Sequence, residues 1–298
     1  MTASRKNAEL TRRATLTGGA LVGVEGLLSP TPAAAASHGS TRYARGWAVL
    51  RETSGDRGAA VIASLADVAP DLGRYIVEFA YGDIFARAGL DLRERELVTV
   101  AALAAAGDTA SQLDFHLDAA LTVGVRPAEI VEALIHLVPF VGFPRALNAV
   151  GVARTVFDDH GVTFEPPVMD DARDRYQRGK EKLVEIDGAH GLEVIESLDD
   201  IAPDLGRYIV EFTFGDVYHR PWLTARLRQL VTVGALTVVG DTAPQLRVHI
   251  GAALNVGLSA AQVVETLIHV VPYAGFPRTL NAITVARDVF EERNTSAP

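Results

Sequence analysis

The chain contains one long sequence unit twice, and this repetition limits the folds open to it more than any other feature. When the sequence is shifted by 133 residues, the segment 71–150 aligns with 204–283 without a gap, and 48 of the 80 aligned positions are identical. A unit of this length can bury a core of its own, unlike the short units of a solenoid. We therefore expect a duplicated domain, with units at 43–159 and 176–292 and a linker at 160–175 that contains two adjacent prolines.

Helix-starting and helix-ending residues predict that each unit is helical throughout. The small and apolar residues of LVTVAALAAA (97–106) are followed by Gly107, and a further helix is expected to end near Leu121. Pro127 is expected in the first turn of the next helix, which Pro139 ends. No alternating apolar pattern between hairpin turns supports a strand. The predicted fold class is all-α, with two tandem helical domains.

Composition excludes several classes of function. The 298 residues include 48% hydrophobic residues, which is enough for substantial cores. The formal net charge of -9 makes nucleic acid and anionic membranes unfavourable partners. The chain has no cysteine, which excludes disulfides, thiol catalysis and cysteine-bound metal.

The first 36 residues are typical of a twin-arginine export signal. The pair Arg12 and Arg13 precedes a mildly apolar stretch, and the alanines at 34–36 resemble a cleavage site. Export to the periplasm or the medium is expected; the alternative is that these residues are a disordered tail and the protein is cytoplasmic. No other segment has the length of a membrane-spanning helix, so the mature protein is expected to be free of the membrane.

One histidine in each unit is a candidate general acid or base. His116 and its copy His249 lie on a helix beside small side chains, which leave room for another element to approach the imidazole. General acid–base catalysis is one interpretation of these two histidines. A core histidine hydrogen-bonded to the backbone is the other.

A second histidine in each unit follows a glutamate at helical spacing. Glu132 and His136 are four residues apart, and so are their copies Glu265 and His269. A carboxylate that accepts from an imidazole N–H would fix its tautomer and make it more basic, as catalysis requires. An ordinary contact on the protein surface is the alternative.

Repeated arginines are candidates for holding a substrate carboxylate. Arg145 follows Pro144 at an expected helix start, where free backbone N–H groups also favour an anion. A salt bridge between the repeats is the alternative for this arginine. The candidate binding residues, in pairs 133 residues apart, are Arg145 and Arg278, Asn148 and Asn281, and Arg95 and Arg228.

The two units differ in one acidic position of the candidate site. Glu96 of the first unit is replaced by Gln229 in the second. We expect Glu96 to take part in catalysis, and the two sites to be unequal. The sequence has no H-E-x-x-H metal motif, no G-x-S-x-G nucleophile motif and no glycine-rich phosphate loop, so neither a metal nor a cofactor is expected.

The order and spacing of several short motifs resemble the carboxymuconolactone decarboxylase family of the AhpD-like superfamily, in tandem. The matching motifs are Y-x-R-G-x-x-x-L at 43–50, FAYGDIF at 79–85, L-x-x-R-x-R-x-L-V-T at 90–99, H-x-x-x-A-L-x-x-G at 116–124, E-I-V-E at 129–132 and G-F-P at 142–144. The resemblance covers nearly the whole chain after the export signal.

The resemblance implies an all-helical fold in closed rings, so that this fused chain would form a homo-oligomer, a trimer of two-domain chains. It also implies cofactor-independent decarboxylation of a small carboxylated lactone. The peroxidase branch of the superfamily has C-x-x-C-x-x-x-H, and Thr109 and Gln112 stand at those cysteine positions before His116. Thiol-based peroxide chemistry is thereby excluded.

Two functional hypotheses follow from the sequence. The first is a lyase for a small carboxylated lactone or related oxo-acid, in which His116 and His249 act as acid or base. The second is an exported binding or scaffold protein that kept the fold without the chemistry.

Overall fold

The computed structural model describes residues 41–163, 165–169 and 174–294, and every regular element among them is a helix. The prediction of an all-α fold is confirmed. None of the described helices is long and apolar enough to cross a membrane. The predicted export signal, residues 1–36, lies outside the described residues.

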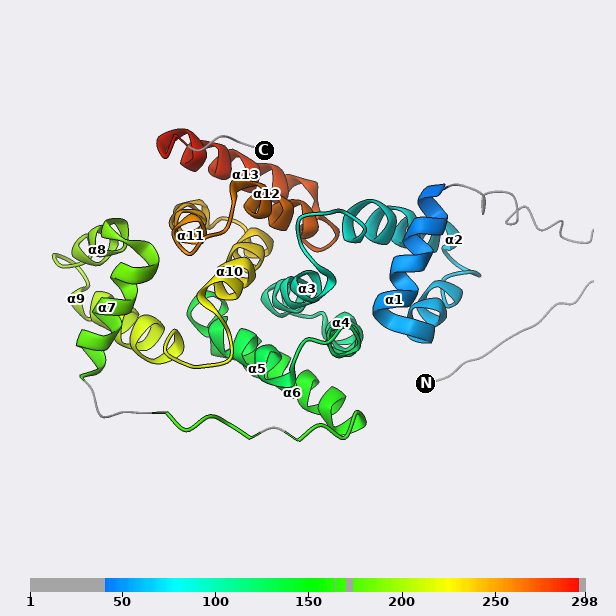
Figure 1. Ribbon diagram of the computed structural model, residues 1–298, viewed down its shortest axis with the longest axis horizontal. Coiled ribbons are helices and arrows are strands. Elements are labelled where there is room, and N and C mark those ends of the chain that lie inside the picture. Colours follow the sequence, from blue (N-terminus) through cyan, green and yellow to red (C-terminus); the bar gives the residue numbers. More distant parts are fainter. Residues whose placement is uncertain (1–40, 164, 170–173, 295–298) are drawn as a thin grey trace, which may run out of the picture. The chain divides into compact units, whose positions relative to one another are not determined.

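The first repeat forms seven helical segments, of which one is a π-helix. Their bounds are α1 (Thr41–Ala63), α2 (Pro70–Tyr75), η1 (Ile76–Phe85), α3 (Leu92–Ala106), α4 (Ala110–Thr122), α5 (Pro127–His136) and α6 (Val138–Asp159) (Figure 1).

The second repeat has the same order of elements, except that the counterpart of α1 is divided in two. Its bounds are α7 (Arg175–Asp187), α8 (Ala189–Glu196), α9 (Pro203–Tyr208), η2 (Ile209–Val217), α10 (Ala225–Val239), α11 (Ala243–Asn255), α12 (Ala260–His269) and α13 (Val271–Glu292). The break falls at Gly188, the copy of Gly55, and both glycines have a positive φ, 68° and 53°.

Local sequence explains where the central helices begin and end. Asp91 and Glu94 form a reciprocal capping box at the start of α3, and Gly107 ends the helix with a φ of 72°. Gly142, with a φ of 79°, interrupts α6, so that Pro144 lies in the first turn of the longer part. The predicted break is therefore present at Gly142, whereas Pro139, which was expected to end a helix, lies in the first turn of α6.

α1 packs against the π-helix η1 through a backbone contact that only glycine allows. A Cβ atom on Gly46 would lie 1.9 Å from the carbonyl oxygen of Val77 and 2.9 Å from the amide nitrogen of Gly82. The second repeat keeps the same contact, with Gly179 against Val210. The N-terminal helix of each repeat is thus held close to the element that precedes the central helix.

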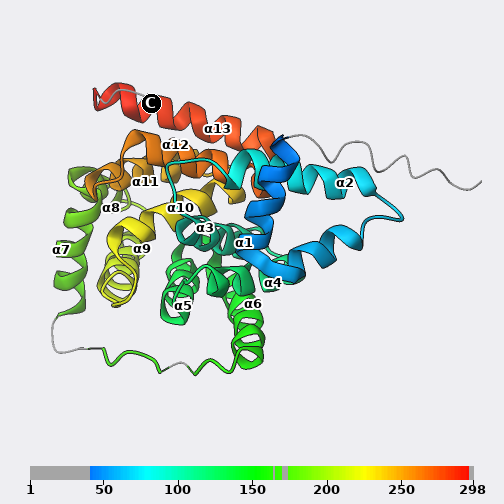
Figure 2. The same cartoon turned by 45° about the vertical axis from the view of Figure 1, so that its right-hand side comes forward.

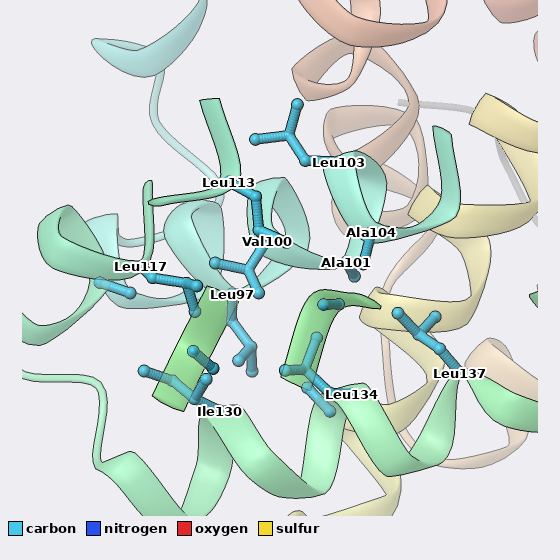
Figure 3. Packing of buried hydrophobic residues seen from close by; sticks show 14 of the residues in the cluster. Leu97, Val100, Ala101, Leu103, Ala104, Leu113, Leu117, Ile130, Leu134 and Leu137 are labelled. Carbon is cyan, nitrogen blue, oxygen red and sulfur yellow. The ribbon is translucent and has the colours of Figure 1, made fainter. Parts of the chain in front are cut away.

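The two repeats are joined by a shared apolar core and not by the linker alone. α3 packs against its copy α10, and both helices are buried along almost their whole length. Leu97 and Val100 of α3 pack with Leu117 of α4 and Leu134 of α5 (Figure 3), and Val231 of α10 belongs to the same cluster. Each repeat therefore completes the core of the other.

The shared core brings the end of one repeat against the central helix of the other. α12 and α13 of the second repeat both contact α3 of the first, and α5 and α6 of the first contact α10 of the second. Figure 2 shows α12 and α13, the last helices of the chain, beside α10 and α11. Side chains from the two repeats can consequently meet in one site.

Substitution of Gly46 by alanine is expected to lower the free energy of unfolding by about 3 kcal/mol or more, because α1 must move away from η1. Gly151→Ala in α6 is the matched control. It has open space around its Cβ position and is expected to raise stability by roughly 0.5 to 1 kcal/mol. Urea unfolding followed by circular dichroism measures both. Equal stability of Gly46→Ala and wild type would contradict the close contact.

Candidate active site

The first candidate centre is built around His116 on α4 and Glu96 on α3. The imidazole Nδ1 lies 2.8 Å from Oε2 of Glu96, while His116 is 8% exposed and Glu96 is fully buried. A carboxylate at this distance accepts the Nδ1 hydrogen and fixes the orientation of the ring. The alternative in which His116 bonds to the backbone is therefore wrong.

The other face of this centre comes from the second repeat. The hydroxyl of Tyr273 on α13 lies 3.5 Å from Nε2 of His116 and 3.3 Å from Oγ1 of Thr99 on α3. Thr99 also lies 2.9 Å from Nε2 of His269, at the end of α12. The centre is thus composite, and the first repeat alone lacks one side of it.

A buried arginine holds His269 in place. Arg95 on α3 is fully buried, places a guanidinium nitrogen 3.2 Å from Nδ1 of His269, and donates to Oε1 of Glu265 at 2.7 Å. Arg87 donates to the same carboxylate. The expected contact of Glu265 with His269 is therefore replaced by an indirect one, because Arg95 of the other repeat stands between them.

The second repeat's central helix makes the equivalent arrangement with the first repeat. Arg228 on α10 places a nitrogen 3.3 Å from Nδ1 of His136 and donates to Glu132 at 3.4 Å, and Arg220 donates to Glu132 at 2.7 Å. Glu132 and His136 are both fully buried. The expectation that Glu132 orients His136 directly is corrected in the same way, and the alternative of a surface contact is wrong.

Burial fixes the charge and the tautomer of these two histidines. Burial, together with the positive charge of Arg95, lowers the pKa of His269 to about 3, and burial with Arg228 lowers that of His136 well below its usual value. Both rings are consequently neutral at pH 7. Since an arginine can only donate, Nδ1 of each ring accepts and Nε2 carries the hydrogen.

The second candidate centre has the same plan with different chemistry. Nδ1 of His249 on α11 lies 3.1 Å from Oε1 of Gln229, whose Nε2 donates to the hydroxyl of Tyr218 at 2.8 Å. Phe140 occupies the place of Tyr273, edge-on to the imidazole at 5.0 Å between ring centres. Burial lowers the pKa of His249 to about 4, so this ring is neutral at pH 7.

The sequence matches a model of the carboxymuconolactone decarboxylase family at residues 70–155 and again at 203–288. The chain belongs to the carboxymuconolactone decarboxylase family. The two matched segments are displaced by the same 133 residues as the repeats, and they contain both composite centres.

Two relatives that are named as decarboxylases are similar to part of the chain. A 4-carboxymuconolactone decarboxylase of Acinetobacter baylyi is 34% identical over 119 residues, which cover 40% of this chain and 88% of the relative. A nitrosuccinic acid decarboxylase of Metarhizium robertsii is 33% identical over 85 residues, covering 28% of this chain and 58% of the relative.

A solved structure from Burkholderia xenovorans, described as a gamma-carboxymuconolactone decarboxylase subunit, supports the fold. It matches with a TM-score of 0.53 at 23% identity, covering 84% of this chain and 98% of that one. At this level of identity the likeness concerns the arrangement of the helices alone.

Not all of the predicted carboxylate-binding residues lie at the two composite centres. Arg145 and Asn148 line a pocket of about 480 Å³ beside Gly107 and Thr109. Their copies Arg278 and Asn281 line another pocket, of about 210 Å³, and Arg278 donates to the carbonyl of Val238 at 2.6 Å. His116 and His249 line neither pocket.

Arg95 and Arg228 do hold a carboxylate each, but it belongs to the chain itself. Glu265 and Glu132 neutralise these two buried guanidinium groups. Among the described residues, no group of three or more histidines and acidic residues is placed to bind a metal ion.

Several polar residues of the centres escaped the sequence analysis. Tyr273, Thr99 and Tyr218 lie on apolar helix faces, where aromatic and β-branched residues usually fill a core. The only signal was the exchange of Tyr and Phe between the repeats, as at Phe140 and Tyr273. It could be interpreted only once the structure had placed both positions beside a histidine.

One further buried acid distinguishes the second centre. Asp187, at the end of α7, is 7% exposed and occupies the position of Ser54 in the first repeat. Its Oδ1 atom has no hydrogen-bond partner within the described part of the chain. Burial raises the pKa of Asp187 to about 7, although His190 acts in the opposite direction. Burial also raises the pKa of the nearby Tyr218, and the charge of Asp187 raises it further.

Asp187→Asn is expected to stabilise the protein progressively as the pH rises. Between the ordinary aspartate pKa of 3.8 and about 7, the unfolded chain loses a proton that the folded chain keeps, so the wild type loses stability over this range and then levels off. At about 1.4 kcal/mol for each pKa unit, the gain of Asp187→Asn approaches roughly 4 kcal/mol at pH 8.

Thermal and urea unfolding at pH 4, 6 and 8 measure this gain. The matched control is Asp199→Asn, which removes an exposed carboxylate and should show no comparable pH dependence. A gain that is the same at all three pH values would mean that Asp187 ionises normally in the fold.

Proposed function

We propose that the chain is a cofactor-independent decarboxylase of a small carboxylated lactone or related oxo-acid, and that its first composite centre carries out the reaction. The buried contact between His116 and Glu96 is the observation that carries this proposal. In this contact Glu96 holds Nδ1 of the imidazole, which leaves Nε2 to exchange a proton with a substrate. The decarboxylase names of the relatives from Acinetobacter and Metarhizium support the reaction type.

The reaction needs an acid more than a nucleophile. When the carbon–carbon bond to the carboxylate breaks and carbon dioxide leaves, its electron pair passes to the adjacent carbonyl system and forms an enolate. The proton on Nε2 of His116 then moves to carbon, and the imidazole regains a proton from water. Glu96 stabilises the positive ring before the transfer and orients it throughout.

The second centre lacks the features on which this chemistry depends. Gln229 cannot carry the negative charge that stabilises a protonated His249, and burial keeps that ring neutral. We therefore propose one competent centre in each chain. Arg145 and Arg278 stay the candidates for holding a substrate carboxylate, but they would do so from pockets that neither His116 nor His249 lines.

Release of carbon dioxide by single variants tests the proposal. With lactones labelled with ¹³C in the carboxyl group, the wild type is expected to release labelled carbon dioxide, and His116→Ala to lower kcat at least about 100-fold. Glu96→Gln, which copies the residue of the second repeat, is expected to lower kcat about 10- to 100-fold. His249→Ala, the matched control on the other repeat, should change kcat by less than about twofold.

Two results would contradict this assignment. Equal losses for His116→Ala and His249→Ala would show that both centres work. No carbon dioxide from any carboxylated lactone or oxo-acid would remove the decarboxylase proposal and favour the alternative of an exported binding protein.

We also propose that the chain associates with copies of itself. Equivalent apolar side chains are exposed on both repeats, with Phe143 and Phe276 at 60% and 61% and Leu147 and Leu280 at 66% and 64%. Exposed apolar side chains at matching positions are typical of an interface between subunits. Export through the twin-arginine route is a further proposal, which rests on the sequence of residues 1–36.

A further inference from the structure

We propose that Tyr273, contributed by the second repeat, is a catalytic residue of the first centre, and that Phe140 at the equivalent position keeps the second centre inactive. The inference rests on the proposed decarboxylation. The hydroxyl of Tyr273 shares the Nε2 side of His116 with the substrate and donates a hydrogen bond to the enolate oxygen as carbon dioxide leaves.

The direction of the hydrogen bonds around Tyr273 is set by a fixed charge. Arg95 can only donate, so Nδ1 of His269 accepts and its Nε2–H is shared between the hydroxyl of Thr99 and the backbone carbonyl of Arg95, both at 2.9 Å. Thr99 donates to Tyr273 at 3.3 Å, and in the imidazolium that the proposed reaction uses, Nε2–H of His116, 3.5 Å away, can also only donate to this hydroxyl, which leaves the hydrogen of Tyr273 for another partner. The phenol hydrogen is therefore available to the substrate, beside the nitrogen that supplies the proton.

In the second centre, the corresponding chain of hydrogen bonds is interrupted at two points. His136 donates to Thr232 at 2.8 Å, but Thr232 turns its hydroxyl to the carbonyl of Arg228 at 2.9 Å. Phe140 then offers no hydroxyl to His249. The loss of the donor coincides with the loss of the acid at Gln229, so the same centre lacks both groups that the proposed reaction uses.

Tyr273 is suited to donate a hydrogen bond and keep its proton. Burial raises its pKa, and the negative charge of Glu96 raises it further, so the phenol stays protonated. The charged imidazolium of His116 is then the group that gives up a proton. A neutral donor aimed at developing negative charge stabilises the transition state more than the bound substrate.

Tyr81 does not share this role. It lies close to Thr53 on α1, and the second repeat replaces it by Phe214. Tyr273 is the tyrosine whose hydroxyl lies within reach of Nε2 of His116.

The loss experiment is Tyr273→Phe, a change that copies the second repeat and keeps the ring. We expect kcat to fall about 10²- to 10³-fold while KM changes less than about threefold, because the donor acts on the transition state. Tyr75→Phe, which removes an exposed hydroxyl, is the control and should keep wild-type kcat and KM. Equal melting temperatures of wild type and Tyr273→Phe show that the fold is intact.

The gain experiment rebuilds the second centre in a chain whose first centre is disabled. In the His116→Ala background, Gln229→Glu, Phe140→Tyr and Asp187→Ser give the second centre the corresponding residues of the first. Asp187→Ser removes a carboxylate that would repel the new glutamate near Tyr218. We expect turnover at least about tenfold above His116→Ala, and no such gain when Phe140 is left in place.

The possible outcomes separate this inference from the proposed function. If the wild type is active and His116→Ala is not, but Tyr273→Phe keeps wild-type kcat, the role of Tyr273 is overturned and the proposed function stands. Equal turnover of the rebuilt centre with and without Phe140→Tyr also overturns it. If the wild type releases no carbon dioxide from any substrate, the proposed function fails and this inference fails with it.

Discussion

The buried ion pairs between the repeats are the interactions on which the rest of this structure depends. Arg95 of the first repeat pairs with Glu265 of the second, and Arg228 of the second pairs with Glu132 of the first. A buried charge without its partner costs about 3 to 5 kcal/mol, so neither repeat can bury its arginine unless the other is in place. Together with the packing of α3 on α10, these pairs make the two repeats one folding unit.

These ion pairs hold helix ends of each repeat against the central helix of the other repeat. The same arrangement creates the candidate centres. Because Arg95 reaches across to Glu265, the end of α12 and the start of α13 lie against α3, which brings His269 and Tyr273 to His116. Because both repeats belong to one chain, their two centres can differ in sequence, whereas the centres of identical subunits cannot. One centre keeps its acid and its phenol, while the other is free to lose both, as Gln229 and Phe140 show.

Local sequence patterns predicted much of the fold. They also predicted the part of the site that lies within one repeat. Glycines and prolines predicted the ends of α3, α4 and α5. The small side chains beside His116, and the helical spacing of Glu132 and His136, predicted that both histidines belong to a functional site. Glu96 was expected to matter because it differs between the repeats, and it lies 2.8 Å from His116. The role given to Glu132 was wrong in its partner, since helical spacing places Glu132 near His136 but takes no account of an arginine from another helix.

The sequence by itself determined the duplication, the helical class and the acidic residue that one repeat has and the other lacks, because each of these is a matter of local pattern or of comparing two aligned copies. Only the tertiary structure decided that Tyr273 belongs with His116 and Phe140 with His249. The reason is physical: apolar faces specify that helices pack, but many partners satisfy the same apolar face. The choice of partner across 157 residues depends on the shared core of α3 and α10 and on the buried charges that must be paired within it.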